Sequence, residues 1–274
     1  MTLSAQSKLA QVRHQVAIWG FVSDALTQAP IPAAEVVLVQ MPPSLSQRLA
    51  LKALQAGNQW QTLPERGDRI WAIPNRSVAL VDSAAGDYTL QTQTATDGSF
   101  TFLDLPDGSY TVRAALPAAG TRYAAATSAT LTVTCNQQHT ISPARVELQM
   151  PPTALAGRVT APDPQEQSIA ALKNLAPNGA VTPAPPPAPK TIPIPMAKVQ
   201  LQETGDYTYT NAAGEYCLTR LEASETKAWA IAVSAPGYEL DAAESSINVK
   251  LQQGKVQTQD FSLKHKFAPL ASTT

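Results

Sequence analysis

The clearest alternation of hydrophobic and polar positions lies in residues 96–113. The dipeptides Asp97-Gly98 and Asp107-Gly108 predict tight turns there, because glycine accepts the positive φ that such turns need. After each turn, large apolar residues alternate with small polar ones, as they do in a half-buried strand. We therefore predict two short strands that send these residues into one core: Phe100, Phe102, Leu105, Tyr110 and Val112.

Further apolar segments bounded by turn residues predict the other strands of a first domain. They are residues 16–22, 31–39, 88–94, 129–134 and 141–148. A polar lead-in, residues 1–15, precedes them. We predict that this domain covers residues 16–150.

The same pattern starts again after Pro151-Pro152. Residues 154–160 repeat the first strand, residues 194–201 the second, and residues 210–218 the turn and strand around Phe100. Three later apolar segments, 230–238, 247–251 and 256–263, complete the second copy. We predict a second domain over residues 151–264 and a C-terminal tail over residues 265–274.

Residues 44–57 carry a different period. Ser44 is a suitable N-cap, leucines follow at helical spacing, and Gly57 stands at the C-terminal end, so a short amphipathic helix is predicted. This helix could close an open end of the first domain. Alternatively it could bind a partner, with Leu45 and Leu49 as contact residues.

The second domain contains a long proline-rich insertion, residues 161–193. Ten of the chain's 23 prolines fall in residues 161–195, among them Pro185, Pro186 and Pro187. Such a segment buries too little apolar area to fold alone and favours polyproline II or disorder. It is predicted to be either a surface loop or an extended arm that binds a groove of a neighbouring subunit.

Composition adds limits on function. Hydrophobic residues make up 44 % of the chain and charged residues 15 %, which is enough apolar material for two cores. The formal net charge is −1 and no basic patch stands out, so nucleic acid is not an expected partner. Trp60 and Trp71, between two predicted strands, are added to the candidate partner-binding residues.

Catalytic chemistry finds little support. The three histidines, His14, His139 and His265, are scattered, and Cys135 and Cys217 have neither metal-ligand nor redox spacing. We expect no enzyme activity, no cofactor and no metal. The polar N-terminus lacks the apolar run of a signal peptide, and no segment has the apolar length of a membrane span, so a cytoplasmic location is expected.

The turn and strand motifs also carry a family resemblance. Residues 96–113, with the Gly-x-Val of residues 20–22 and the Pro-Ile-Pro-x-Ala of residues 30–34, resemble the carboxypeptidase regulatory-like family of prealbumin-like and Cna B-type modules. The resemblance implies an all-β fold of two tandem seven-stranded Greek-key sandwiches that hold or display other parts. The second copy departs from the motif at residues 221–227, where Glu, Ser and Thr replace the Leu-Pro-x-Gly turn.

A narrower resemblance concerns residues 97–111 followed by the turn at 116–123. This run is similar to carboxypeptidase regulatory-like proteins of contractile injection systems, phage-tail-like particles assembled in the bacterial cytoplasm. It implies a structural accessory subunit, associated with the baseplate or cap, that binds other particle proteins. The alternative is a tandem glycan-binding module, in which Trp60, Trp71 and Trp229 would be stacking platforms.

Overall fold

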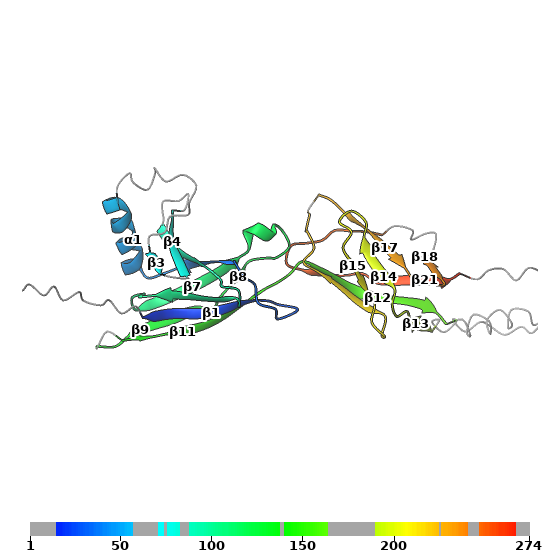
Figure 1. The fold of residues 1–274 in the computed structure, drawn as a ribbon, viewed down its shortest axis with the longest axis horizontal. Helices are drawn as coiled ribbons and strands as arrows, with labels where there is room; N and C mark the ends of the chain where they lie inside the picture. Colours follow the sequence, from blue (N-terminus) through cyan, green and yellow to red (C-terminus); the bar gives the residue numbers. More distant parts are fainter. Residues whose placement is uncertain are drawn as a thin grey trace, which may run out of the picture. The chain divides into compact units, whose positions relative to one another are not determined.

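The structure, a computed structural model, describes residues 15–56, 71–73, 76–82, 88–137, 140–163, 190–224, 226–240 and 247–266. The chain is mostly β and divides into two compact units (Figure 1). Unit 1 is Met1–Ala119 with Ala125–Pro151, and unit 2 is Gly120–Ala124 with Pro152–Thr274.

The described residues of unit 1 form two sheets and one α-helix. The smaller sheet has the order β11-β1-β6, and the larger has the order β10-β9-β7-β2-β5-β4-β3, with β8 beside β7. Its elements are β1 (Val16–Asp24), β2 (Glu35–Gln40), α1 (Pro43–Ala56), β3 (Trp71–Ile73), β4 (Arg76–Asp82), β5 (Tyr88–Gln93), β6 (Ser99–Leu103), β7 (Gly108–Ala115), the 3-10 helix η2 (Pro117–Ala119), β8 (Ala126–Thr127), β9 (Leu131–Cys135), β10 (Ile141–Ser142) and β11 (Ala144–Met150).

The core of unit 1 confirms the alternation in residues 96–113. All five residues predicted to point inward are at most 2 % exposed: Phe100, Phe102, Leu105, Tyr110 and Val112. The preceding turn depends on Gly98, which has φ +74°; a Cβ there would lie 2.5 Å from the carbonyl oxygen of Val22. The period-2 pattern and the turn glycine therefore specify the register of β6 against β1.

The described residues of unit 2 also form two sheets, one in which several strands pair with β12 and one with the order β15-β14-β17-β19. Strands β13, β16, β20 and β21 pair with β12, and β18 pairs with β21. The strands are β12 (Ala154–Pro162), β13 (Thr191–Pro193), β14 (Lys198–Leu201), β15 (Tyr207–Tyr209), β16 (Glu215–Thr219), β17 (Trp229–Ser234), β18 (Tyr238–Leu240), β19 (Ile247–Val249), β20 (Val256–Thr258) and β21 (Phe261–His265).

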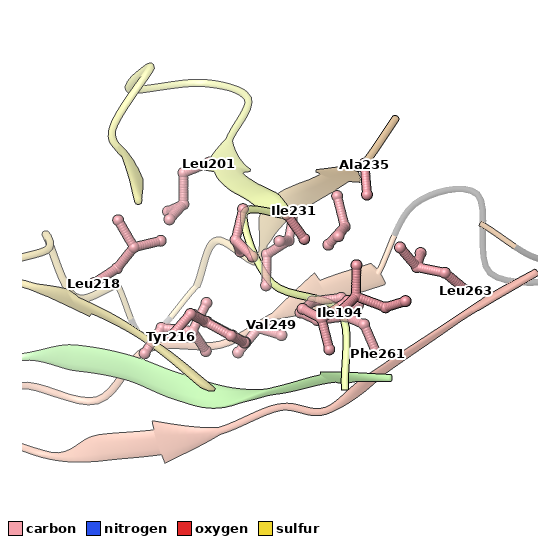
Figure 2. Packing of buried hydrophobic residues seen from close by; sticks show 14 of the residues in the cluster. Ile194, Leu201, Tyr216, Leu218, Ile231, Ala235, Val249, Phe261 and Leu263 are labelled. Atoms are coloured by element: carbon pink, nitrogen blue, oxygen red, sulfur yellow. The ribbon is translucent and has the colours of Figure 1, made fainter. Parts of the chain in front are cut away.

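The two sheets of unit 2 enclose one hydrophobic cluster (Figure 2). Tyr216, Leu218 and Phe261 enter it from the sheet of β12, while Leu201 and Ile231 enter from the other sheet. Inward residues occur at alternate positions of β16 and β17, as in a sheet with one buried face.

The units repeat one another at the level of single hydrogen bonds. In unit 1 the buried Thr94 hydroxyl donates to the carbonyl oxygen of Ile31 at 2.6 Å and accepts from the amide of Ala34 at 2.8 Å. In unit 2 Thr210 makes the same pair of bonds, at 2.6 Å to Ile194 and 2.8 Å from Ala197. The sequence repeat therefore corresponds to a repeated pattern of hydrogen bonds between a buried threonine hydroxyl and the backbone.

A close approach of two backbones is repeated as well. A Cβ on Gly20 would lie 2.0 Å from the carbonyl oxygen of Val146, and one on Gly157 would lie 1.8 Å from that of Gln259. Real Cβ atoms do not come so near a backbone oxygen. Only glycine fits these two equivalent positions of β1 and β12.

Some predicted boundaries were wrong. Strand β2 begins at Glu35 and not at residue 31, because Ala33 has φ +56° and Pro32 lacks an amide hydrogen. Residues 141–148 form two strands, β10 and β11, interrupted at Pro143. Strands β3, β4, β8, β13 and β15 were not predicted. The predicted bounds of the Pro-rich insertion, 161–193, were wrong at both ends, because β12 extends to Pro162 and residues 191–193 form β13. Helix α1 confirms the prediction for residues 44–57.

Candidate functional site

Groups that could support catalysis or metal binding are dispersed. Among the described residues no cluster of three or more His, Cys, Asp or Glu side chains could hold a metal ion. His265 packs its ring 4.5 Å from that of Tyr238, between the centroids, while His14 and His139 lie outside the described residues. Cys135 in unit 1 is half-buried, and Cys217 in unit 2 is exposed.

The two buried tyrosines of the repeated motif have structural roles. Tyr110 donates its hydroxyl hydrogen to the carbonyl oxygen of Pro106 at 2.7 Å, and Tyr216 donates to that of Gln259 at 2.7 Å. Burial raises the pKa of both hydroxyls well above the ordinary tyrosine value, and nearby carboxylates raise it further. Both therefore stay protonated donors and are poorly suited to be general bases.

The candidate partner-binding residues have different outcomes. On α1, Leu45 and Leu49 are buried, 6 % and 7 % exposed, and the helix contacts β5. Their side chains are thus occupied within unit 1, which favours the interpretation of the helix as a cover. Trp71 begins β3, and its side chain is outside the described part of the chain. The remaining candidates also lie outside the described residues: Trp60, Pro185, Pro186 and Pro187.

Trp229, a candidate stacking platform only in the glycan-binding alternative, is a core residue. Trp229 is 7 % exposed and belongs to the hydrophobic cluster of unit 2. The ammonium group of Lys227 lies 4.3 Å from the centroid of its ring. An inward position in β17, alternating with Ala230, explains why this tryptophan is a core residue.

An open apolar groove of about 480 Å³ lies on the outer face of the sheet β11-β1-β6 in unit 1. Trp19 and Phe21 of β1 line it, with Val16 at one end and Pro143 from the connection before β11. The rings of Trp19 and Phe21 meet edge to face, 6.0 Å between centroids. Val16 and Phe21 are 40 % and 36 % exposed, so this apolar surface is in contact with solvent.

A cation stands beside the groove. The guanidinium carbon of Arg145 lies 5.2 Å from the centroid of the Trp19 ring, and Arg145 also pairs with Glu147 on the same strand. The cation occupies one face of the indole and limits its use as a bare platform for a sugar ring.

The equivalent face of unit 2 is built differently. Register pairs Phe21 with Ser99 in unit 1 and Arg158 with Glu215 in unit 2. Arg158 and Glu215 form an ion pair at 2.8 Å, and Ala156 stands where unit 1 has Trp19. This ion pair holds the pKa of Glu215 below its usual value through the hydrogen bond from Arg158.

A second aromatic surface lies on unit 2. Tyr207 and Tyr209 of β15 are 56 % and 50 % exposed, with ring centroids 5.8 Å apart. The ammonium group of Lys198 on β14 lies 4.6 Å from the Tyr207 ring centroid. Aligning Thr94 with Thr210 puts Gln91 and Gln93 of unit 1 at the positions of these tyrosines.

Neither aromatic surface was among the predicted sites. The sequence pattern predicts a strand that contains Trp19 and Phe21, but the alternation in β1 does not show which large residues face solvent. A signal was nevertheless present in the repeat itself. Aligned on Gly20 and Gly157, the two copies differ in character where Trp19 and Phe21 stand in place of Ala156 and Arg158.

The sequence matches no protein-family model and no curated protein. Solved structures similar to this chain include a minor pilin of Streptococcus agalactiae, at 12 % identity over 96 % of this chain and 100 % of the pilin, with a TM-score of 0.29. The shaft pilin SpaA of Lactobacillus rhamnosus GG is 9 % identical over 93 % and 99 %, with a TM-score of 0.33. A streptococcal ancillary pilin is 11 % identical over 92 % and 69 %, with a TM-score of 0.37.

These TM-scores are low, and the pilins carry no argument about the function of this chain. A separate finding is that no helix among the described residues has both the length and the apolar character needed to cross a membrane.

Proposed function

We propose that this chain is a non-enzymatic structural subunit that binds other proteins of a multi-copy assembly. In this proposal each unit is a prealbumin-like Greek-key sandwich that serves as a rigid support. The buried threonine hydroxyls already form hydrogen bonds within each unit and hold its framework together. Partner binding is therefore assigned to the outer surfaces of the units.

The observation that carries the proposal is the contrast between the two outer faces. Unit 2 forms the same strand pairing as unit 1 with Ala156 and Arg158 in place of Trp19 and Phe21. The framework therefore does not need aromatic residues there. Exposed apolar groups on a monomer mark interaction surfaces when they are contiguous, and these two rings line one groove.

The chemistry of the groove fits a protein better than a glycan. Aromatic residues and arginine are enriched at protein interfaces, and Trp19 with Arg145 supplies both. A partner that offers an apolar side chain to the rings and a carboxylate to Arg145 would match this surface. The glycan alternative loses one of its three platforms with the burial of Trp229.

The finer assignment rests on the sequence resemblance alone. It makes the assembly a contractile injection system particle, built in the cytoplasm, with this chain near the baseplate or cap. The Pro-rich insertion, with Pro185, Pro186 and Pro187, is proposed as an arm that binds a neighbouring subunit. Many weak contacts in a multi-copy particle would offset the entropy lost on ordering such a segment.

The test transfers residues of unit 2 into unit 1. The double variant Trp19→Ala with Phe21→Arg is produced in the source cells, and particle incorporation is followed by sedimentation and co-purification. We expect a normal thermal unfolding profile and a loss of incorporation. Val39→Arg is the matched control, because Val39 is 50 % exposed on β2 of the same unit, outside the groove. Normal incorporation of the double variant would contradict the role of the groove.

A second variant separates the arm from the groove. Replacing residues 165–189 with a short Gly-Ser linker should leave both units folded and weaken incorporation. Normal incorporation of this chain would reduce the insertion to a passive loop, whatever the groove does.

A further inference from the structure

Strand β15 forms an edge of the four-stranded sheet in unit 2. The hydrogen bonds to β14 show which alternate residues of β15 direct their backbone groups towards that strand. The amide of Leu201 donates to the carbonyl oxygen of Asp206 at 2.9 Å, and the amide of Thr210 donates to that of Ala197 at 2.9 Å. These two bonds bracket the antiparallel ladder. In such a ladder, alternate residues exchange both bonds with the partner strand.

This alternation determines which backbone groups of β15 point away from β14. Thr208, opposite Val199, directs its amide and carbonyl at β14, as the residues two positions away do. Tyr207 and Tyr209 direct theirs to the opposite side. Among the described strands, none pairs with that side of β15. Open strand edges of this kind are templates for another strand.

Unit 1 shows what occupies the same edge when the chain closes it. There β5 corresponds to β15, and β4 pairs with it antiparallel, Ala79 opposite Gln91 and Val81 opposite Thr89. The framework therefore accepts an additional antiparallel strand at this place. In unit 2 the described chain supplies none.

The side chains of the open edge are arranged for contact. Tyr207 and Tyr209 are about half exposed on one face, packed edge to face, with Lys198 against the first ring. Tyrosine contributes large contact area at a low cost in side-chain entropy. No charged residue lies within β15 itself.

We propose that β15 pairs antiparallel with β15 of a second copy of this chain, about a two-fold axis through Thr208. The inference rests on the proposed function only in taking this chain to associate with protein subunits. Tyr207 of one copy stands opposite Tyr209 of the second copy. Each such pair exchanges both of its outward N–H···O=C bonds, so the edge is self-complementary, as a closed two-fold interface requires.

Charges do not oppose this pairing. Across the axis, Asp206 stands opposite Thr210 of the second copy and not opposite another acid. The two copies of Lys198 are separated by three strand spacings of about 4.8 Å, roughly 14 Å. That distance exceeds the Debye length of about 8 Å at physiological ionic strength.

The experiment uses the full chain and a single cysteine. Cys135→Ser and Cys217→Ser remove the native thiols, and Thr208→Cys places one thiol on the axis. Thr208 faces its copy in a non-hydrogen-bonded pair, where Cα atoms lie about 4.5 Å apart. This separation lies within the disulfide range of about 4.4–6.8 Å. We expect a covalent dimer on mild oxidation and a concentration-dependent dimer of the native chain in sedimentation velocity.

Tyr207→Cys in the same background is the register control. Its two copies lie diagonally, roughly 7–8 Å apart, and cross-link much less readily. Equal cross-linking at both positions would overturn the register. A native chain that stays monomeric at millimolar concentration would overturn the pairing.

A proline variant tests the backbone bonds directly. Tyr209→Pro removes one outward N–H per copy and leaves the bonds to β14 in place. It should weaken dimerisation at least about tenfold. Gln93→Pro makes the same change at the equivalent position of unit 1 and should leave dimerisation unchanged. If circular dichroism shows that the Tyr209→Pro variant is unfolded, the comparison of cross-linking in Thr208→Cys and Tyr207→Cys tests the pairing instead.

The Pro-rich insertion is a competing occupant of the β15 edge, and it predicts a different result. Were the native chain monomeric, and the chain with residues 165–189 replaced by a Gly-Ser linker dimeric, the insertion would be the occupant, and self-pairing would be wrong for the native chain. All of these measurements use purified protein, whereas the proposed function is tested by particle incorporation. A monomer that still enters particles would therefore refute only this inference.

Discussion

Units 1 and 2 share a framework and differ in what they expose. In the sheet that contains the first strand of each unit, unit 1 lines a groove with Trp19 and Phe21, whereas unit 2 has an exposed Arg158–Glu215 ion pair. At the edge of the other sheet the contrast is reversed. In unit 1 β4 pairs with β5, whereas no described strand of unit 2 pairs with the outer side of β15, which carries two exposed tyrosines. Each unit thus serves as a control for the other, because these outward-facing residues differ between two units that form the same strand pairing.

The largest expected effect is at the two close-approach glycines. Gly157→Ala would place a Cβ 1.8 Å from the carbonyl oxygen of Gln259, and Gly20→Ala one 2.0 Å from that of Val146. Neither backbone can yield without breaking the parallel pairing, so each change should cost more than about 5 kcal/mol, beyond ordinary overpacking. Chemical denaturation measures this cost. A loss in only one unit would show that the frameworks differ.

Equivalent core residues should follow next. Phe102 is 0 % exposed and Leu218 is 5 % exposed, and they occupy the same register position in β6 and β16. Phe102→Ala should cost about 3–5 kcal/mol and Leu218→Ala about 2–5 kcal/mol, from lost burial and the cavity left behind. Unfolding midpoints give the values. An unchanged midpoint for Phe102→Ala would mean that the register of β6 is wrong.

The repeated threonines should give a smaller and matched effect. Thr94→Val and Thr210→Val each leave a buried amide and a carbonyl without the hydroxyl, at a cost of about 1–3 kcal/mol. Thr92→Val is the control: its hydroxyl is buried without a partner among the described residues, so its removal should be neutral or slightly stabilising. A loss of stability in Thr92→Val equal to that of Thr94→Val would refute this hydrogen-bond pattern.

The smallest effect concerns the ion pair found only in unit 2. Arg158 lowers the pKa of Glu215, so the pair contributes stability above the unfolded-state pKa and loses it as pH falls through the folded-state value. In Arg158→Ala the pKa of Glu215 should rise towards its ordinary value, as followed by an NMR titration. Because the pair is exposed, the change in unfolding free energy should be small. An unaltered pKa of Glu215 in Arg158→Ala would show that Arg158 does not stabilise the Glu215 carboxylate.

The buried half of this molecule was readable from the sequence, and much of the exposed half was not. Phe100 and Phe102 could be placed because period-2 alternation and a turn glycine leave one register that buries them. Strands β3 and β4 were missed because the Trp-containing segment before β5 shows no clean alternation. Trp19 and Tyr207 were missed because solvent-facing positions are not constrained by packing, so a single strand carries no sign of their role.

Side-chain footprinting by hydroxyl radicals, in the free chain and in the assembled particle, tests the division between framework and binding surfaces most directly. Trp19 and Phe21 should react readily in the free chain and be protected in the particle. Cys217, on the equivalent face of unit 2 and exposed, should react in both states. Trp19 and Phe21 reacting at the same rate in the free and assembled states would contradict the assignment of partner binding to the groove of unit 1.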